Sequence, residues 1–518
     1  MLKKLHVIFL LFSFHFVIAQ SVEWVATPAI AITTPVPSGY ICATDAFGNA
    51  YFAGYKDNPY SYTELFGNLL YQKYTTSGTL LFSKTISERA VVHQMQSDSQ
   101  GNMLLAVEHL NTLTYETTTI PNATGLPQHV LLKISPTGDL LWHKVLTMPV
   151  VGVNTFKAIA FDVLDNIYLG YDNYGTCHIE KLSPAGVSLQ LIVQQNVNRL
   201  TSLAVDAAGN IYATGSCANI NSVYAGVLQP TNFDYTVYLV KYNAAGVFQW
   251  IKYVQDITCT TPMVQVATDG NVYWAAELFL PVQLGTIQLE GPTTGGSDFF
   301  LAKLNALGEY VWAREVPGAG SVEVGHHNFL QLDAFGSVYL TGTLSGGITQ
   351  WNEQVTTNTG TFSNRQILLL RYLDNGALIF AFTAGGAQND YGNSIATTST
   401  DTVLLTGKMQ GNATLGWYTH TNADSFGYNP FLAKISPITL SLPDSETTSV
   451  RIYPNPVMDV LTVETSQTIV GITVFSLNGQ RMSLPQFGNQ VDFSGVANGV
   501  YVVEVETEIG VKRVKVVR

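Results

Sequence analysis

The sequence predicts an all-β protein: a seven-bladed β-propeller with four-stranded blades, closed into a ring by its N-terminal strand, and then a small C-terminal β-sandwich. Three observations support this prediction. A tight-turn motif recurs seven times, a basic residue and a glycine recur at fixed spacing beside it, and the pattern changes near the C-terminus. We expect a signal peptide at 1–19, the propeller at 20–436, a linker at 437–449 and the β-sandwich at 450–518.

The composition fits an exported β protein that does not bind nucleic acid. Charged residues make up 12% of the 518 residues, and the net charge is −12. A chain without a basic face has little to neutralise phosphates. Lys3 and Lys4 precede an apolar run at 7–17 and small residues at 17–19, which is the pattern of a cleaved signal peptide. No other stretch predicts a membrane span, so we expect none in the mature chain.

The recurring turn predicts hairpins. Asp, Gly and Asn cap a tight turn or adopt positive φ at low cost. The copies are Asp45–Asn49, Asp98–Asn102, Asp162–Asn166, Asp206–Asn210, Thr268–Asn271, Asp333–Ser337 and Thr398–Thr402. Each lies between two short apolar runs, so each unit begins with a strand, a turn and a second strand.

A second element predicts the third and fourth strands of each unit. A basic residue precedes a glycine by five positions, and a bulky residue usually follows four positions later, as in Lys133, Gly138 and Trp142. The seventh unit, at Phe431–Lys434, lacks this fourth strand, whereas Val22-Glu-Trp24 stands unpaired at the N-terminus. We therefore expect the N-terminal strand to complete the last unit, which removes the free sheet edges.

The predicted topology places the long connections on one face. Turns between the first and second strands and between the third and fourth lie on the opposite face, because antiparallel strands alternate in direction. Any ligand site is therefore expected on the face with the long loops, or at the mouth of the central channel.

The repeat resembles the SBBP-type seven-bladed propeller. The resemblance rests on Asp-x-x-Gly-Asn-x-Tyr-x-x-Gly, on Asp298-Phe-Phe-Leu-Ala-Lys303 and on Gly385-Gly-Ala-Gln-Asn-Asp390-Tyr-Gly, and it spans about 22–436. It implies the fold but no catalytic residues, because that family shares none.

The C-terminal block is similar to the type A C-terminal sorting domain of the type IX secretion system of Bacteroidetes-type bacteria. The residues that carry the similarity are Tyr453, Pro454, Asn455, Pro456, Gly479, Gly499, Tyr501, Lys512, Arg513 and Lys515. The resemblance implies the secretion machinery as a partner, and a product that is secreted or anchored to the outer surface. An ordinary adhesive β-sandwich is the alternative.

Candidate binding residues are few. His326, beside His327, is expected in a loop that leads into the sixth unit. Trp351, Trp417, Tyr418 and Tyr235 lie in long loops, where they would stack on sugars, contact a protein partner or simply pack their own hairpins. Cys177 and Cys217 fall in neighbouring units and would either form a disulfide or remain buried thiols. No catalytic motif, metal site or cofactor is predicted.

Two functions follow from this reading. The first is a non-catalytic binding or interaction propeller at the cell surface, with a glycan or a surface protein as its ligand. The alternative is a secreted polysaccharide hydrolase or lyase with an acidic pair at the channel mouth. A structural component of the envelope is a third possibility.

Overall fold

The computed structural model describes residues 20–28, 40–57, 67–146, 155–255, 261–292, 296–318, 320–352, 355–358, 364–398, 402–422, 427–437, 450–465, 467–476, 481–508 and 510–518. The predicted signal peptide at 1–19 lies outside these residues, as do most of the linker, Cys259 and Gly479. Contacts divide the chain into two compact units, Met1–Ile438 and Thr439–Arg518.

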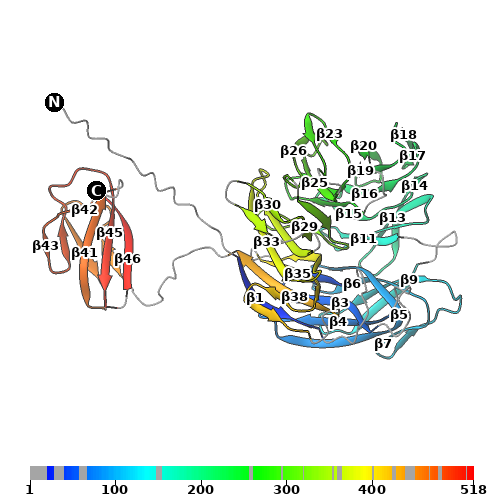
Figure 1. Ribbon diagram of the computed structural model, residues 1–518, viewed down its shortest axis with the longest axis horizontal. Helices are drawn as coiled ribbons and strands as arrows, with labels where there is room; N and C mark the ends of the chain where they lie inside the picture. The colour runs from blue at the N-terminus through cyan, green and yellow to red at the C-terminus, as the bar shows by residue number, and fades with distance from the viewer. Residues whose placement is uncertain are drawn as a thin grey trace. The chain divides into compact units, whose positions relative to one another are not determined.

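Every regular element of the described chain is a β-strand, and every pairing is antiparallel, so the all-β prediction is confirmed (Figure 1). Among these residues no helix has the length and apolar character needed to cross a membrane. Two consecutive groups of strands share one long sheet: β2 (Ile41–Thr44), β3 (Ala50–Asp57), β4 (Gly67–Tyr74) and β5 (Leu80–Ser97), then β6 (Met103–His109), β9 (Gln128–Ile134) and β10 (Leu140–Val145). β5 belongs to both groups, because its first half pairs with β4 and its second half with β6.

The following groups repeat the same order. They are β11 (Thr155–Phe161), β12 (Ile167–Asp172), β13 (Thr176–Leu182) and β14 (Ser188–Gln195); β15 (Ser202–Val205), β16 (Ile211–Cys217), β19 (Thr236–Tyr242) and β20 (Phe248–Gln255); and β21 (Met263–Val266), β22 (Val272–Leu278), β25 (Asp298–Leu304) and β26 (Tyr310–Arg314). The next is β27 (Ser321–Val324) with β28 (Leu330–Leu332), β29 (Val338–Ser345), β32 (Gln366–Tyr372) and β33 (Leu378–Gly386).

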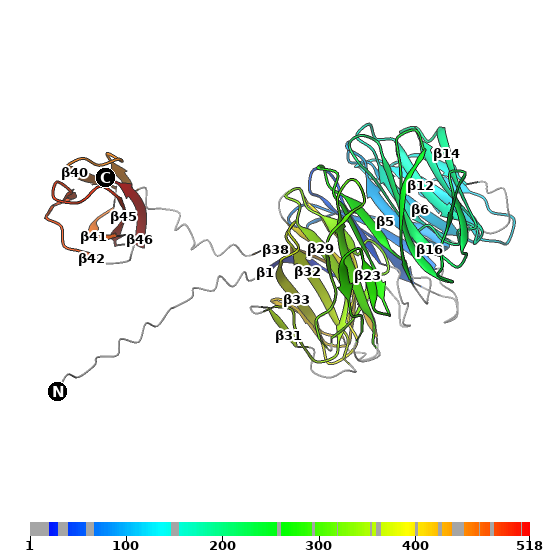
Figure 2. The same cartoon turned by 90° about the horizontal axis from the view of Figure 1, so that it is seen from above.

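The last sheet of this unit joins the two ends of the repeat. It contains β34 (Tyr391–Thr397), β35 (Val403–Gln410), β38 (Tyr428–Pro437) and β1 (Gln20–Ala26). β1 pairs with β38 along its length, as the unpaired aromatic strand at the N-terminus predicted. Figure 2 also shows β1 beside β38. The first strands of successive groups, β2, β5, β11, β15, β21, β28 and β34, contact one another in that order, and β34 contacts β2.

The long loops do not stay open on one face. Their described parts contain five hairpins: β7 (Leu113–Tyr115) with β8 (Thr118–Ile120), β17 (Asn221–Tyr224) with β18 (Val227–Pro230), β23 (Val282–Leu284) with β24 (Ile287–Leu289), β30 (Ile348–Gln350) with β31 (Thr356–Asn358), and β36 (Ala413–Leu415) with β37 (Tyr418–His420). Three of them pair with the fourth strand of the preceding group: β7 with β5, β17 with β14 and β36 with β33. These loops therefore cover outer sheet edges that would otherwise be open to aggregation.

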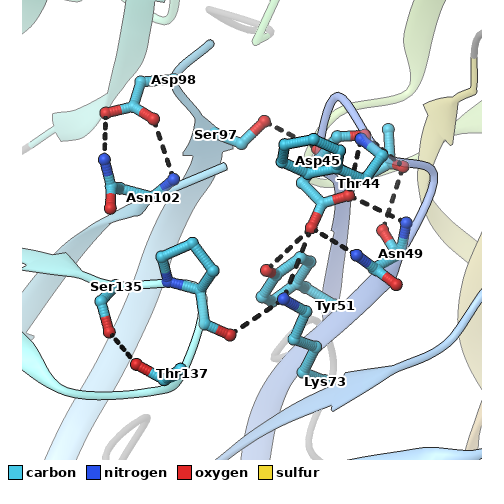
Figure 3. A network of polar contacts seen from close by, with 12 residues as sticks. Thr44, Asp45, Asn49, Tyr51, Lys73, Ser97, Asp98, Asn102, Ser135 and Thr137 are labelled. Carbon is cyan, nitrogen blue, oxygen red and sulfur yellow. Dashed lines mark hydrogen bonds and ion pairs between the residues drawn. The ribbon is translucent and has the colours of Figure 1, made fainter. Parts of the chain in front are cut away.

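The residues of the repeat form a network within and between the sheets. Asp45 accepts hydrogen bonds from Asn49 and Tyr51 and forms an ion pair with Lys73 at 3.5 Å (Figure 3). Lys73 also donates a hydrogen bond to the carbonyl of Pro136 in the next group. Asp98 and Lys133 repeat the ion pair at 2.8 Å. Buried ions of this kind need partners, and these are supplied by the repeat itself. The repeated polar residues are thus structural.

The repeated aromatic residue connects one group to the next by a hydrogen bond and by packing against a glycine. Trp142 on β10 donates its indole N–H to the carbonyl of Pro184 at 3.3 Å, beneath the turn at Gly186. Trp24 on β1 makes the same bond to the carbonyl of Thr76 at 3.0 Å and lies against Gly78. A Cβ on Gly78 would come within 2.7 Å of the Trp24 ring, and φ is +84°, so both the close approach and the backbone favour glycine. Where the aromatic is missing, Gln190 fills the place beside Gly246.

The C-terminal unit contains two antiparallel four-stranded sheets. One contains β39 (Arg451–Tyr453), β40 (Val460–Glu464), β44 (Gln490–Asp492) and β43 (Gln486–Phe487), and the other β42 (Arg481–Met482), β41 (Ile469–Ser476), β45 (Val500–Thr507) and β46 (Gly510–Val517). Alternate residues of these strands share one apolar core, which includes Leu461, Val474 and Val503.

Candidate functional site

A cavity of about 260 Å³ lies between the first strands of the groups, and residues of all of them line it. Among the lining residues are Thr44 of β2, Gln94 of β5, Lys157 of β11, Ser202 of β15, Met263 of β21, Gln331 of β28 and Thr397 of β34. The cavity is therefore the central channel of this arrangement, and Lys157 is the only charged side chain among its lining residues.

One end of the channel is surrounded by residues at equivalent positions. Each stands nine residues before the last residue of the recurring turn, in a first strand or just before it. They are Tyr40, His93, Lys157, Thr201, Pro262, Asn328 and Asn393. Unlike the turns, these seven positions carry six different residue types. We call this end of the channel, with the loop residues beside it, the channel mouth.

His93, Glu108 and His129 form the most concentrated group at the mouth. His93 Nε2 lies 2.5 Å from Glu108 Oε2, and His129 Nε2 lies 3.6 Å from the same oxygen. The two imidazole rings stack with their centroids 6.2 Å apart. The side chains of His93 and Glu108 are each 16% exposed, and that of His129 is 3% exposed. The group is therefore largely enclosed but open to solvent on one side.

The strands explain how these three side chains meet. Glu108 on β6 stands directly opposite His129 on β9, so both point to one face of the sheet. On β5 the register shifts between Val92 and Gln94, which leaves His93 as the extra residue of a bulge. Bulges redirect side chains, and this one supports the approach of His93 to Glu108.

The electrostatics of this group favour an ionised carboxylate at Glu108. Burial acts to raise the pKa of Glu108, but the hydrogen bonds with His129 and His93 outweigh it and lower the pKa to about 2. Burial lowers the pKa of His93 more than its contact with Glu108 raises it. Glu108 therefore remains an anion at neutral pH.

Basic side chains also lie near the mouth. Burial, and then the charge of Arg199, lower the pKa of Lys157. His326 keeps contact with solvent, but desolvation and the nearby charges of Lys157 and Lys408 lower its pKa to about 4. Lys408 is buried over the rings of Tyr391 and Tyr428, with its ammonium 4.4 and 4.5 Å from their centroids. Its pKa falls to about 8, because of burial and then the charge of Arg365.

Two asparagines complete the mouth. Asn328 accepts a hydrogen bond from Gln94 at 2.6 Å, which joins β5 to the segment before β28. Asn393 is 1% exposed, and both polar atoms of its side chain lack a hydrogen-bond partner within the described chain. His327 lies beside them: its backbone N–H donates to the carbonyl of Asn393, and its Nδ1 is 3.2 Å from the carbonyl of His93. A buried amide without a partner is costly, and a polar ligand or water would satisfy it.

The structure brings His326 to the mouth but not the predicted aromatic residues. Trp351 packs against a core cluster and donates to Thr357 at 2.9 Å, and Tyr418 packs against another cluster. Trp417 is 66% exposed, but its indole N–H bonds to the carbonyl of Val22. Tyr235 is 46% exposed in the loop before β19. Three of the four therefore pack against the scaffold, which was the simpler of the interpretations that the sequence left open.

The predicted disulfide is absent from the structure. Cys177 and Cys217 lie in one apolar cluster, but both are free thiols, as is Cys42. Cys177 donates to the carbonyl of Val197 at 3.3 Å and Cys217 to that of Asn196 at 3.1 Å. Each thiol is thus directed to a backbone oxygen instead of to the other sulfur.

Three of the sorting residues, Asn455, Gly499 and Tyr501, form hydrogen bonds within their own unit. The Asn455 side chain donates to the carbonyl of Lys515 at 2.8 Å and accepts from the N–H of Val517 at 2.9 Å. Gly499 exchanges two backbone hydrogen bonds with Arg518, and the Tyr501 hydroxyl donates to the carbonyl of Ala497 at 2.7 Å. Tyr453 is 48% exposed, Lys515 is exposed, and the peptide bonds before Pro454 and Pro456 are cis. Lys512 is partly exposed, and Arg513 lies on β46.

Residues 451–518 match the family of secretion system C-terminal sorting domains. The predicted sorting domain is thereby confirmed, and it indicates export by type IX secretion to the cell surface or the extracellular space. A search of curated proteins found no match.

Solved structures resemble the chain only remotely. The Dos1 propeller is 10% identical, with a TM-score of 0.40 over 80% of this chain and 94% of that one. BBS1N, in a complex with ARL6DN, is 11% identical, with a TM-score of 0.40 over 81% and 97%. A protein of unknown function from Bacteroides caccae is 12% identical, with a TM-score of 0.32 over 54% and 84%. Scores this low carry no functional argument.

Sequence reasoning did not find His93, His129, Lys157 and Lys408, and it gave no partner for Glu108, which it placed on or near the face with the long loops. The available signal was the register of the repeat. Counting from each recurring turn shows that Glu108 and Lys408 occupy the same position of their second strands, and that His93 and Lys157 share a position of their first strands. Motif searches along one segment do not find such a set, because its members come from different strands.

Proposed function

We propose that the chain is an exported, non-catalytic seven-bladed β-propeller of the SBBP-like type that binds an anionic ligand at its channel mouth. In this proposal a signal peptide occupies 1–19, the propeller 20–436, a linker 437–449 and a sorting β-sandwich 450–518. The ligand is a glycan with carboxylate or sulfate groups, met at the cell surface or in the medium.

The sheet arrangement supports the seven-bladed form. Seven groups of strands share one order, their first strands contact each other in a closed series, and β1 completes the last group. The repeated Asp, Lys and Trp residues are engaged in holding the sheets together, which leaves function to positions where the groups differ.

The observation that carries the ligand proposal is the gathering of basic groups at the mouth. Lys157 reaches the channel, Arg199 lies near enough for its charge to act on Lys157, and Lys408 lies near enough for its charge to act on His326. The chain as a whole has a net charge of −12, so this basic mouth opposes the overall charge. Cations held in a concave, partly desolvated surface attract anions strongly and fix their orientation.

The hydrolase alternative lacks a matching arrangement in the described part of the chain. It needs two carboxyl groups that act on one bond. At the mouth, Glu108 is engaged by two histidines, and Glu323 forms an ion pair with Arg365 at 2.7 Å. Asp390 accepts two backbone hydrogen bonds. Each of these carboxyl groups has a structural partner.

A glycan array with the purified full chain tests the proposal. We expect binding to glycans with uronate or sulfate groups and little binding to neutral ones, with loss of binding in K157M and K408M. K84M is the matched control, because Lys84 lies on the first half of β5 and forms an ion pair with the exposed Glu116. Binding to neutral glycans that is unchanged in K157M would refute the anionic site and return attention to Trp417 and Tyr235.

Export has a separate test. Deletion of 451–518 is expected to leave the protein inside a type IX-competent cell, while the wild type reaches the surface or the medium. Fractionation followed by immunoblotting measures this, and normal delivery of the truncated chain would contradict the assigned route.

A further inference from the structure

We propose that His93, Glu108 and His129 bind one divalent transition-metal ion, with zinc as the ion that the ligand set fits. The expected ligand atoms are Nε2 of each imidazole and a carboxylate oxygen of Glu108. These three atoms all lie within 4.8 Å of one another. Two histidines and one glutamate form a familiar three-ligand set for zinc with an open fourth position. The proposal goes beyond the proposed anion binding and does not depend on it.

The geometry needs only a small adjustment. In a tetrahedral zinc site with bonds of about 2.0–2.1 Å, ligand atoms stand about 3.3 Å apart. The distance from His129 Nε2 to Glu108 Oε2 is already 3.6 Å, and the one from His93 Nε2 is 2.5 Å. Binding would therefore replace the His93–Glu108 hydrogen bond by two metal bonds, with an outward shift of His93. His93 occupies the bulge of β5, where the ladder constrains the backbone least.

The register of the repeat shows that this set is local to one group. The second-strand position of Glu108 and its third-strand partner His129 recur in every group. The equivalent pairs are Tyr55 with Leu69, Asp172 with Cys177, Ser216 with Val237, Glu277 with Phe299, Thr343 with Ile367 and Lys408 with Pro430. The third-strand residue is apolar or a cysteine in all six of these pairs, so a histidine opposite a carboxylate occurs in the second group alone among these positions.

The surroundings determine what the fourth position would hold. Glu108 supplies one negative charge, so a bound dication leaves the site positive. Lys157 is near enough for its charge to lower the pKa of His93, and it adds to that positive potential. The open position therefore favours an anionic oxygen or a water molecule over a further cationic or apolar group.

Zinc titration of the purified full chain, stripped of metal by a chelator, tests the site. We expect one equivalent of zinc per chain by competition with a chromophoric chelator, and cobalt to give the visible absorption of a tetrahedral site. H93A and H129A should each weaken zinc binding by about 100-fold or more, because each removes one of three ligands. E108Q should weaken binding as well, and the cobalt spectrum should be lost in all three.

Matched controls separate the site from other histidines and from misfolding. H143Q changes an exposed histidine on the outer strand β10, and H178Q changes a histidine that stacks on Tyr171 at 5.2 Å. Both should bind zinc as the wild type does. Zinc should also raise the melting temperature of the wild type but not that of H129A, and circular dichroism of each apo variant reports its fold. The proposal would be overturned if the wild type did not bind zinc, or if folded H93A and H129A bound zinc as the wild type does. His93, Glu108 and His129 would then be a group of polar contacts without a metal.

Discussion

Removal of the Trp24 side chain is expected to release the strand that closes the repeat. β1 is held to the unit by its pairing with β38, by an ion pair between Glu23 and Lys434 at 2.9 Å, and by Trp24. In W24A the hydrogen bond to Thr76 is lost, which costs about 1 kcal/mol. Loss of stacking on Tyr74, at 6.2 Å between centroids, adds about 0.5–1.5 kcal/mol. Lost apolar burial of a partly exposed ring adds about 1–2 kcal/mol.

The sum, about 3 kcal/mol, is a change in the free energy of local opening. Hydrogen exchange measures this directly, because local opening and global unfolding expose different amides. Amides of 21–26 in W24A should exchange about 100-fold faster than in the wild type, since every 1.4 kcal/mol is a factor of ten. The paired strand β38 should lose protection on the side that faces β1.

W142A is the matched control. Trp142 makes the same type of bond to Pro184, but its strand is joined to the chain at both ends and lies within the repeat. We expect W142A to lose stability without selective exposure of β1. The reasoning would be refuted if amides of 21–26 in W24A exchanged at rates within threefold of those in the wild type. The backbone hydrogen bonds between β1 and β38 alone would then hold β1 in place.

Three further predictions concern the mouth and the core. K157M removes a cation that lies near both proposed sites, so it should tighten zinc binding and weaken the binding of acidic glycans. Titrations with zinc and with an acidic glycan measure the two effects. Loss of zinc binding together with loss of glycan binding would contradict the assignment. Burial raises the pKa of Asp298 to about 7, so the folded chain holds more protons than the unfolded chain between pH 4 and 7, and stability falls as pH rises through that range. D298N keeps Oδ1, which accepts both backbone hydrogen bonds, but removes the group that titrates. It should reduce the difference in melting temperature between pH 5 and pH 8. An unchanged difference would exclude Asp298 as the source of the pH dependence. Cys42, Cys177 and Cys217 should not react with a thiol reagent in the native chain and should react after denaturation without reductant. A disulfide between Cys177 and Cys217 would leave these two unreactive after denaturation.

The sequence predicted local structure better than contacts between repeats. Asp, Gly and Asn in the recurring turn determine a hairpin by their own backbone preferences, so the turns and the all-β fold were accessible. The spacing of Lys133, Gly138 and Trp142 predicted two strands and a turn. It did not show that Trp142 holds the following group, because that contact joins residues 42 positions apart.

The long loops show what single-sequence reasoning could not see. The ligand site was expected on the face that carries these loops or at the mouth of the central channel, and the pairing of the loops themselves was not predicted. β7, β17 and β36 pair with outer strands, a result set by free edges and not by loop composition. The site residues His93, Glu108 and His129 meet through a bulge and a cross-strand pair, and neither is visible in single-sequence periodicity.

The pairing of β1 with β38 makes the last sheet of the repeat depend on residues more than 400 positions apart. β1 has no partner until residues 428–437 have been synthesised, so the ring stays open until then. The sorting domain begins at 451, and β38 ends at 437. The sequence that indicates export is therefore made soon after the last partner strand. A chain truncated before that point lacks both its closing strand and its sorting domain, so we expect incomplete products to be retained and not displayed.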